Sequence, residues 1–114
     1  MITCIIEYDL NPYQRSDFEQ YAKVWGQAIP QCGAELIGYF APHEGSTTKA
    51  FGIYNVDDLA AYEAYRARLS AHPLGKENYE FAMDKKFIRS ENRAFYKLVS
   101  QPHAWLIPAK GAPK

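Results

Sequence analysis

The middle of the chain, from Leu36 to Pro73, reads as a strand, a polar turn, a second strand and an amphipathic helix that ends at His72-Pro73. The helix should stop there because the residue before a proline disfavours helical backbone geometry. Apolar residues recur at helical spacing along it, and Arg66 falls on the same arc, which should face the core. A hairpin followed by such a helix favours an α+β domain, but it does not indicate a reaction.

Alternation and turn signals extend this pattern over the rest of the chain. The expected elements are strand 2–10, helix 16–32, strand 34–42, strand 49–56, helix 58–71, helix 77–89 and strand 93–101. This βαββααβ order is the ferredoxin-like plan with one extra helix on an antiparallel sheet. Residues 1–101 are the expected domain, and residues 102–114, which contain three prolines, are an expected extended C-terminal tail.

Both faces of the predicted sheet are rich in apolar side chains. A lone sheet with helices on one face alternates apolar and polar residues cleanly, because its other face meets water. Two apolar sets compete here for the buried side: Ile37, Tyr39, Phe51, Ile53, Tyr96 and Leu98 against Leu36, Phe40, Tyr54, Phe95 and Val99. A second copy that covers the open face, sheet against sheet, resolves this conflict, so we expect a homodimer.

Charge and cysteine content narrow the partners and the compartment. Thirteen basic and thirteen acidic residues give zero formal charge, so neither nucleic acid nor a membrane is an expected partner. The basic cluster Lys85, Lys86, Arg89 and Arg93 is interpreted as a solvated helix face. The two cysteines form no CxxC pair, so no metal and no cofactor is expected. The N-terminus has no signal-peptide features, and the chain has no long apolar run. We therefore expect a cytoplasmic protein.

Several short motifs occur in an order that resembles the NIPSNAP family. They are Glu35-Leu36-Ile37-Gly38-Tyr39-Phe40, Gly45, Asp57-Asp58-Leu59, Arg66-Ala67-Arg68-Leu69 with His72-Pro73, and Glu91-Asn92-Arg93. The best match covers residues 34–73. The resemblance implies the dimeric α+β barrel that members of this family adopt. It implies no reaction, because the family has no established common one.

The candidate ligand-binding residues are Arg66, His72, Tyr39, Tyr54 and Tyr62. Arg66 is either structural, with its charged end reaching solvent or paired with Glu63 three residues earlier, or an anchor for an anion or carbonyl at a cavity between helix and sheet. His72 is either a cation at a helix C-terminus or an acid or base at the cavity edge. The three tyrosines are either core residues whose hydroxyl groups reach the solvent, or they line a pocket.

Three classes of function are compatible with these residues, and the sequence does not decide whether the protein is an enzyme. The first is a homodimeric protein that binds a small apolar or aromatic metabolite between sheet and helices. The second, by analogy of fold, is a cofactor-independent monooxygenase, and the third is a non-catalytic interaction module. A cavity with Arg66 or His72 facing it would favour the first two, whereas a filled core would favour the third.

Overall fold

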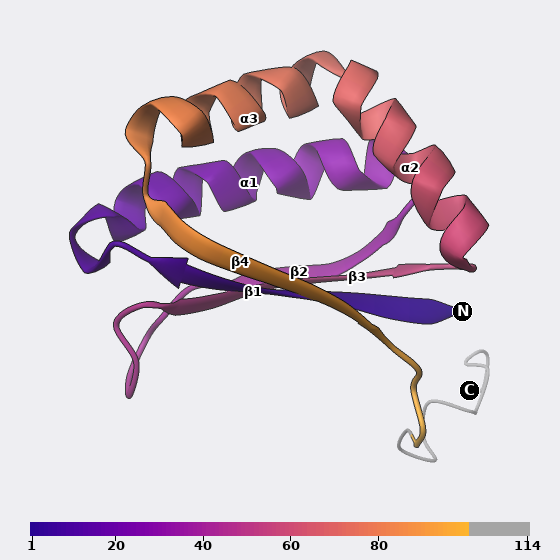
Figure 1. Ribbon diagram of the computed structural model, residues 1–114, viewed down its shortest axis with the longest axis horizontal. Coiled ribbons are helices and arrows are strands. Elements are labelled where there is room, and N and C mark those ends of the chain that lie inside the picture. Colours follow the sequence, from indigo (N-terminus) through magenta and orange to yellow (C-terminus); the bar gives the residue numbers. More distant parts are fainter. Residues whose placement is uncertain (101–114) are drawn as a thin grey trace, which may run out of the picture.

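The computed structural model describes residues 1–100, which form a four-stranded antiparallel sheet with helices packed on one face (Figure 1). The strand order β2-β3-β1-β4 confirms the predicted ferredoxin-like α+β fold. The elements are β1 (Ile2–Leu10), a 3-10 turn (Pro12–Gln14), α1 (Arg15–Gln31), β2 (Glu35–Phe40), β3 (Lys49–Val56), α2 (Leu59–Ala71), α3 (Pro73–Lys85) and β4 (Ile88–Tyr96). The expected tail, 102–114, lies outside the described residues. Up to residue 100, no helix has the length and apolarity needed to cross a bilayer.

His72 and Pro73 join two helices directly. α2 ends at Ala71, and α3 begins at Pro73, whose missing N–H costs nothing in a first helical turn. The His72 ring caps the new helix, because its Nδ1 accepts the Leu74 N–H at 3.1 Å. The same residue therefore ends one helix and starts the next.

This junction explains why the predicted boundaries of the last two elements are wrong. The helix predicted at 77–89 is α3 at Pro73–Lys85, and the strand predicted at 93–101 is β4 at Ile88–Tyr96. α3 stops where Lys86 adopts a left-handed backbone conformation with φ of 57°. Because the helix starts immediately, without a loop, everything after it comes about four residues earlier than the sequence suggested.

Aromatic side chains dominate the space between the sheet and the helices. Buried side chains come from alternate positions of β1 and from one side of α1: Cys4, Ile6, Tyr8, Leu10, Phe18, Tyr21, Trp25 and Ile29. Several of their rings meet edge to face, as Tyr21 and Trp25 do with centroids 5.5 Å apart. Both cysteines are reduced and buried.

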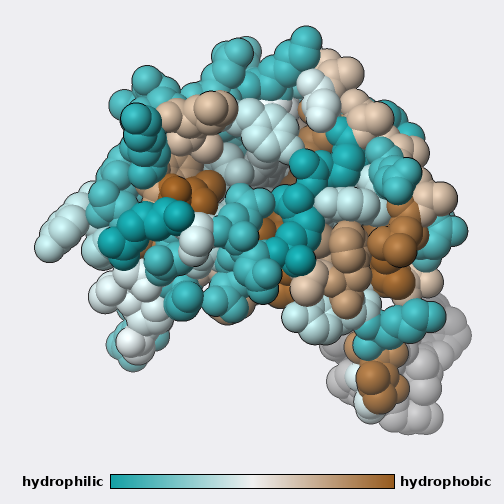
Figure 2. Space-filling model, in the orientation of Figure 1, coloured by the Kyte–Doolittle hydropathy of each residue, from teal (hydrophilic) through white to brown (hydrophobic). Residues whose placement is uncertain are grey.

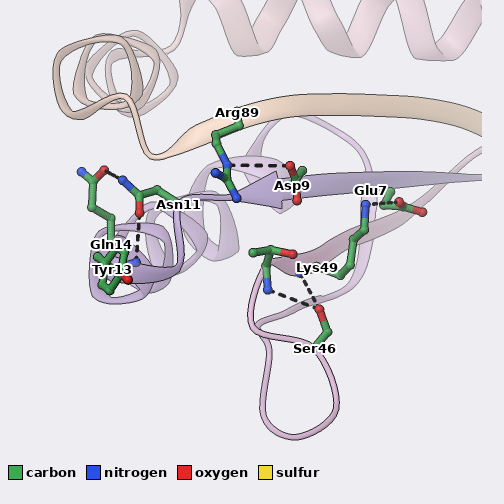
Figure 3. Close-up of polar contacts among 9 residues, drawn as sticks. Glu7, Asp9, Asn11, Tyr13, Gln14, Ser46, Lys49 and Arg89 are labelled. Atoms are coloured by element: carbon green, nitrogen blue, oxygen red, sulfur yellow. Dashed lines mark hydrogen bonds and ion pairs between the residues drawn. The ribbon is translucent and has the colours of Figure 1, made fainter.

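The opposite face of the sheet carries paired charges at one end. Lys49 Nζ lies 3.1 Å from a Glu7 carboxylate oxygen, and Arg89 Nε lies 3.8 Å from an Asp9 carboxylate oxygen (Figure 3). All four side chains are partly exposed, so each pair contributes little to stability. The pairs do balance the charge at this end of β1.

Candidate functional site

A small cavity lies within the aromatic core, between the sheet and the helices. Its volume is about 30 Å³, enough for one or two waters or a small polar group, since each water needs about 10–15 Å³ of such space. Its wall is mostly aromatic but includes charged residues: Ile6, Tyr8, Tyr21, Trp25, Ile29, Tyr39, Tyr54, Tyr65, Arg66, Leu69, Tyr79, Glu91 and Arg93. Charged groups beside so many aromatic side chains are uncommon, so this cavity is the candidate site.

Arg66 reaches this wall from α2. Its Nη1 donates to the Tyr62 hydroxyl at 2.8 Å, and its guanidinium carbon lies 5.8 Å from the Tyr62 ring centroid. Its Nε is buried and has no hydrogen-bond partner. The ion pair with Glu63, one of the alternatives for a structural Arg66, is not formed: within residues 1–100, no carboxylate lies within 4.0 Å of the Arg66 guanidinium. Tyr62 stands one turn earlier on the same side of α2, whereas Glu63 is exposed.

Arg93 reaches the same wall from β4. Its Nη2 pairs with Glu91 Oε2 at 3.0 Å, its Nη1 lies 3.4 Å from the Tyr62 hydroxyl, and its Nε is buried without a partner. The interpretation of Arg93 as part of a solvated basic cluster is wrong. β4 begins early enough for Glu91, Arg93 and Phe95 to alternate inward, and Arg93 pairs in register with Ile6 of β1. One sequence signal did point to this placement. Arg93 is two residues before Phe95, so both side chains lie on the same face of the strand.

The two guanidinium groups are short of acceptors. Both turn to the single Tyr62 hydroxyl, and only Arg93 has a carboxylate, that of Glu91. Burial raises the pKa of Tyr21 to about 12 and raises the pKa of Tyr8 well above its ordinary value. At neutral pH these phenols are therefore uncharged, while both arginines are cations. The wall carries more positive than negative charge, which favours an anion.

A β-bulge brings Tyr39 into the cavity. Simple alternation along β2 placed Tyr39 on the face opposite Leu36, but the register shifts between Leu36 and Gly38. Both Leu36 and Tyr39 consequently pack against the core. The Tyr39 hydroxyl lies 3.2 Å from that of Tyr8. Loss of solvent raises the pKa of Tyr39 well above its ordinary value, so it too stays protonated.

The other candidates occupy different places. Tyr54 is buried on β3 and lines the cavity. Tyr62 bridges the two arginines and packs edge to face on Phe95, with centroids 4.7 Å apart. His72 does not line the cavity: its Nδ1 caps α3, and its Nε2 lies 2.9 Å from Gln31 Oε1.

The NIPSNAP family model matches residues 3–102. The chain belongs to the NIPSNAP family. This confirms the family resemblance of the sequence motifs. No protein of curated function matches the chain.

Solved structures share the fold of this NIPSNAP protein. A NIPSNAP family protein of unknown function from Agrobacterium tumefaciens aligns with a TM-score of 0.76 and 21% identity, covering 90% of this chain and 92% of its own. An uncharacterised NIPSNAP-like domain protein from Burkholderia xenovorans has a TM-score of 0.70 and 26% identity over 89% of each chain. A candidate antibiotic biosynthesis monooxygenase from Nitrosomonas europaea has a TM-score of 0.67 and 10% identity, covering 88% of this chain and 100% of its own. That last likeness concerns the fold alone.

Gly52→Ala should displace the Tyr39 ring of this NIPSNAP protein. A Cβ at Gly52 would lie 2.6 Å from Tyr39 Cζ, closer than real side chains approach. We expect the free energy of unfolding, measured in urea, to fall by about 1–3 kcal/mol, as is usual for overpacking. Tyr39→Leu removes the atoms that collide, so the loss from Gly52→Ala should shrink in that background. Equal losses in both backgrounds would show that Gly52 does not make room for the ring.

Proposed function

We propose that this NIPSNAP protein is a homodimer that binds a small organic molecule at the cavity between its sheet and its helices. The observation that carries the ligand proposal is the pair Arg66 and Arg93. They come from different elements, line one cavity, and each keep a buried Nε without a partner. Leaving such donors unsatisfied is costly, so an acceptor supplied by a ligand would stabilise them.

Binding is favoured over the cofactor-independent monooxygenase alternative by the groups on the wall. Such an enzyme needs a general base near its substrate. Burial raises the pKa of Tyr8, Tyr21 and Tyr39, so these phenols are protonated at neutral pH, and Glu91 is already paired with Arg93. The likeness to the Nitrosomonas protein adds the fold and nothing about chemistry.

The apolar outer face of the sheet supports the dimer. Side chains that point away from the helices are exposed there, including Ile37 at 54% and Tyr96 at 52%. A hollow of about 580 Å³ lies among Met1, Thr3, Ile37, Ile53, Asn55, Lys97 and Leu98. In Figure 2, apolar side chains also gather where the chain leaves β4. A second sheet packed about 10 Å away would cover this face.

Light scattering during gel filtration tests the dimer. A stable homodimer stays associated at about 10 µM protein, because this concentration exceeds its Kd. We therefore expect twice the 13.0 kDa mass of one chain. A mass of one chain at this concentration would contradict the dimer and leave the ligand proposal standing.

Trp25 offers a direct test of ligand binding, because it lines the cavity. The chain has two tryptophans, so Trp105→Phe leaves Trp25 as the sole tryptophan reporter. We expect at least one of three small aromatic probes, phenol, indole or benzoate, to change its fluorescence saturably, with the polar group of the probe in the cavity and its ring outside. Tyr54→Ala, which enlarges the cavity, should tighten the binding of that probe. If neither these aromatic probes nor straight-chain acids perturb Trp25, the ligand proposal is wrong.

A further inference from the structure

A surface groove adjoins the cavity. It has a volume of about 450 Å³ and shares Tyr21, Tyr79 and Glu91 with the cavity wall. Beyond these residues it runs between α3, which contributes Met83, and the start of β4, which contributes Ile88. Met83 is 77% exposed and presents its apolar side chain along the groove. The cavity and the groove are therefore adjacent, the cavity lined by charged groups and the groove mostly by apolar side chains, with Lys86 at its margin.

We infer that the ligand is an amphiphilic carboxylate whose carboxylate lies against Arg66 and Arg93 and whose alkyl or aryl body follows this groove. The inference rests on the proposed ligand-binding function and specifies its ligand class. Size is the first argument. The cavity of about 30 Å³ admits a carboxylate but not a hydrocarbon body, whereas the groove of about 450 Å³ accommodates one.

Charge and hydrogen-bonding geometry are the second argument. Arg66 has no carboxylate partner among residues 1–100, and Arg93 has one, Glu91. A guanidinium presents several N–H donors in one plane, which matches the two oxygens of a carboxylate. A neutral head group of the same shape would leave the positive charge uncompensated. An inorganic anion would satisfy the arginines but would make no use of the apolar groove.

The test is a series of straight-chain acids, butanoate, hexanoate and octanoate, each paired with its neutral amide and titrated into the Trp105→Phe protein. We expect the Kd of the acids to tighten by up to about fourfold per added methylene as the chain enters the groove. Octanamide should bind at least about tenfold more weakly than octanoate, because hydrogen bonds to charged groups are the strong ones. Calorimetry confirms each Kd independently of fluorescence.

Variants locate the two ends of the ligand. Arg66→Met and Arg93→Met should each weaken octanoate binding by about tenfold or more. Arg68→Met and Arg89→Met are matched controls that remove an arginine outside the cavity and should leave the Kd unchanged. Met83→Asp should flatten the dependence on chain length while butanoate binding stays the same.

The possible outcomes distinguish failure of the carboxylate inference from failure of the ligand-binding proposal. If octanamide and octanoate bind with the same Kd, the cavity binds small molecules but the carboxylate inference is wrong. If sulfate competes with butanoate and the longer acids gain nothing, the site takes inorganic anions and the inference also falls. If neither these probes nor the aromatic ones perturb Trp25, both proposals fall. The comparison of acid with amide uses an unaltered cavity, so it decides the question even if an arginine variant does not fold.

Discussion

Gly75→Ala should destabilise the protein by about 3 kcal/mol, the upper end of what overpacking usually costs. Gly75 lies in the first turn of α3, where a Cβ would collide with the Leu69 carbonyl oxygen of α2. That oxygen belongs to rigid backbone and already accepts the His72 N–H at 3.2 Å. Neither group can move aside without separating the two helices. Urea unfolding followed by circular dichroism measures the loss.

Gly26→Ala is the matched control for this substitution. Gly26 lies within α1, is exposed, and has no atom within 4 Å of a built Cβ. Alanine there should stabilise the helix by about 0.5–1 kcal/mol, because glycine has the greater backbone entropy to lose. The two variants should thus change stability in opposite directions. A Gly75→Ala protein as stable as the parent would show that α2 and α3 are not in close contact.

Ile53→Asp should convert the proposed homodimer into a monomer. Ile53 is on β3, half-buried in the single chain and lining the hollow on the outer sheet face. An aspartate there stays solvated in the monomer but would be buried between two sheets, at a cost of at least about 2 kcal/mol per copy. At about 10 µM protein, we expect light scattering to give the mass of a single chain. The circular dichroism spectrum should be unchanged.

Ala64→Asp adds the same charge on the exposed side of α2, away from the sheet face. It should leave the dimer intact. If Ile53→Asp leaves the mass unchanged as well, the copies do not meet through this face.

The parts of the fold predicted well are those in which one local signal acts alone. β1 and β3 match their predicted ranges because strict alternation and flanking turn residues define them. The helix α2 matches because Asp58 caps it, accepting the Ala61 N–H at 2.8 Å, and a proline limits its other end. The start of α3 was missed because a proline has two local meanings, the end of one helix and the first turn of the next.

The site was harder to predict because it depends on contacts between distant elements. Arg66 and Tyr54 were found as candidates from periodicity within one helix and one strand. Arg93 was missed because a late boundary for β4 placed it among surface lysines. The inward turn of Tyr39 follows from a bulge, which shifts alternation by one residue and has no reliable local signature beyond Gly38.

The direct connection of α2 to α3 through His72 has a consequence for how this sequence can vary in length. With no spare residue at the junction, one inserted residue would rotate the start of α3 by about 100° about its axis. Met83 would leave the groove, and Gly75 would no longer face Leu69. The polar segment 41–48 between β2 and β3 carries no such constraint. Engineered tags or reporters are therefore best placed in that hairpin, and libraries that vary chain length should leave the helix corner untouched.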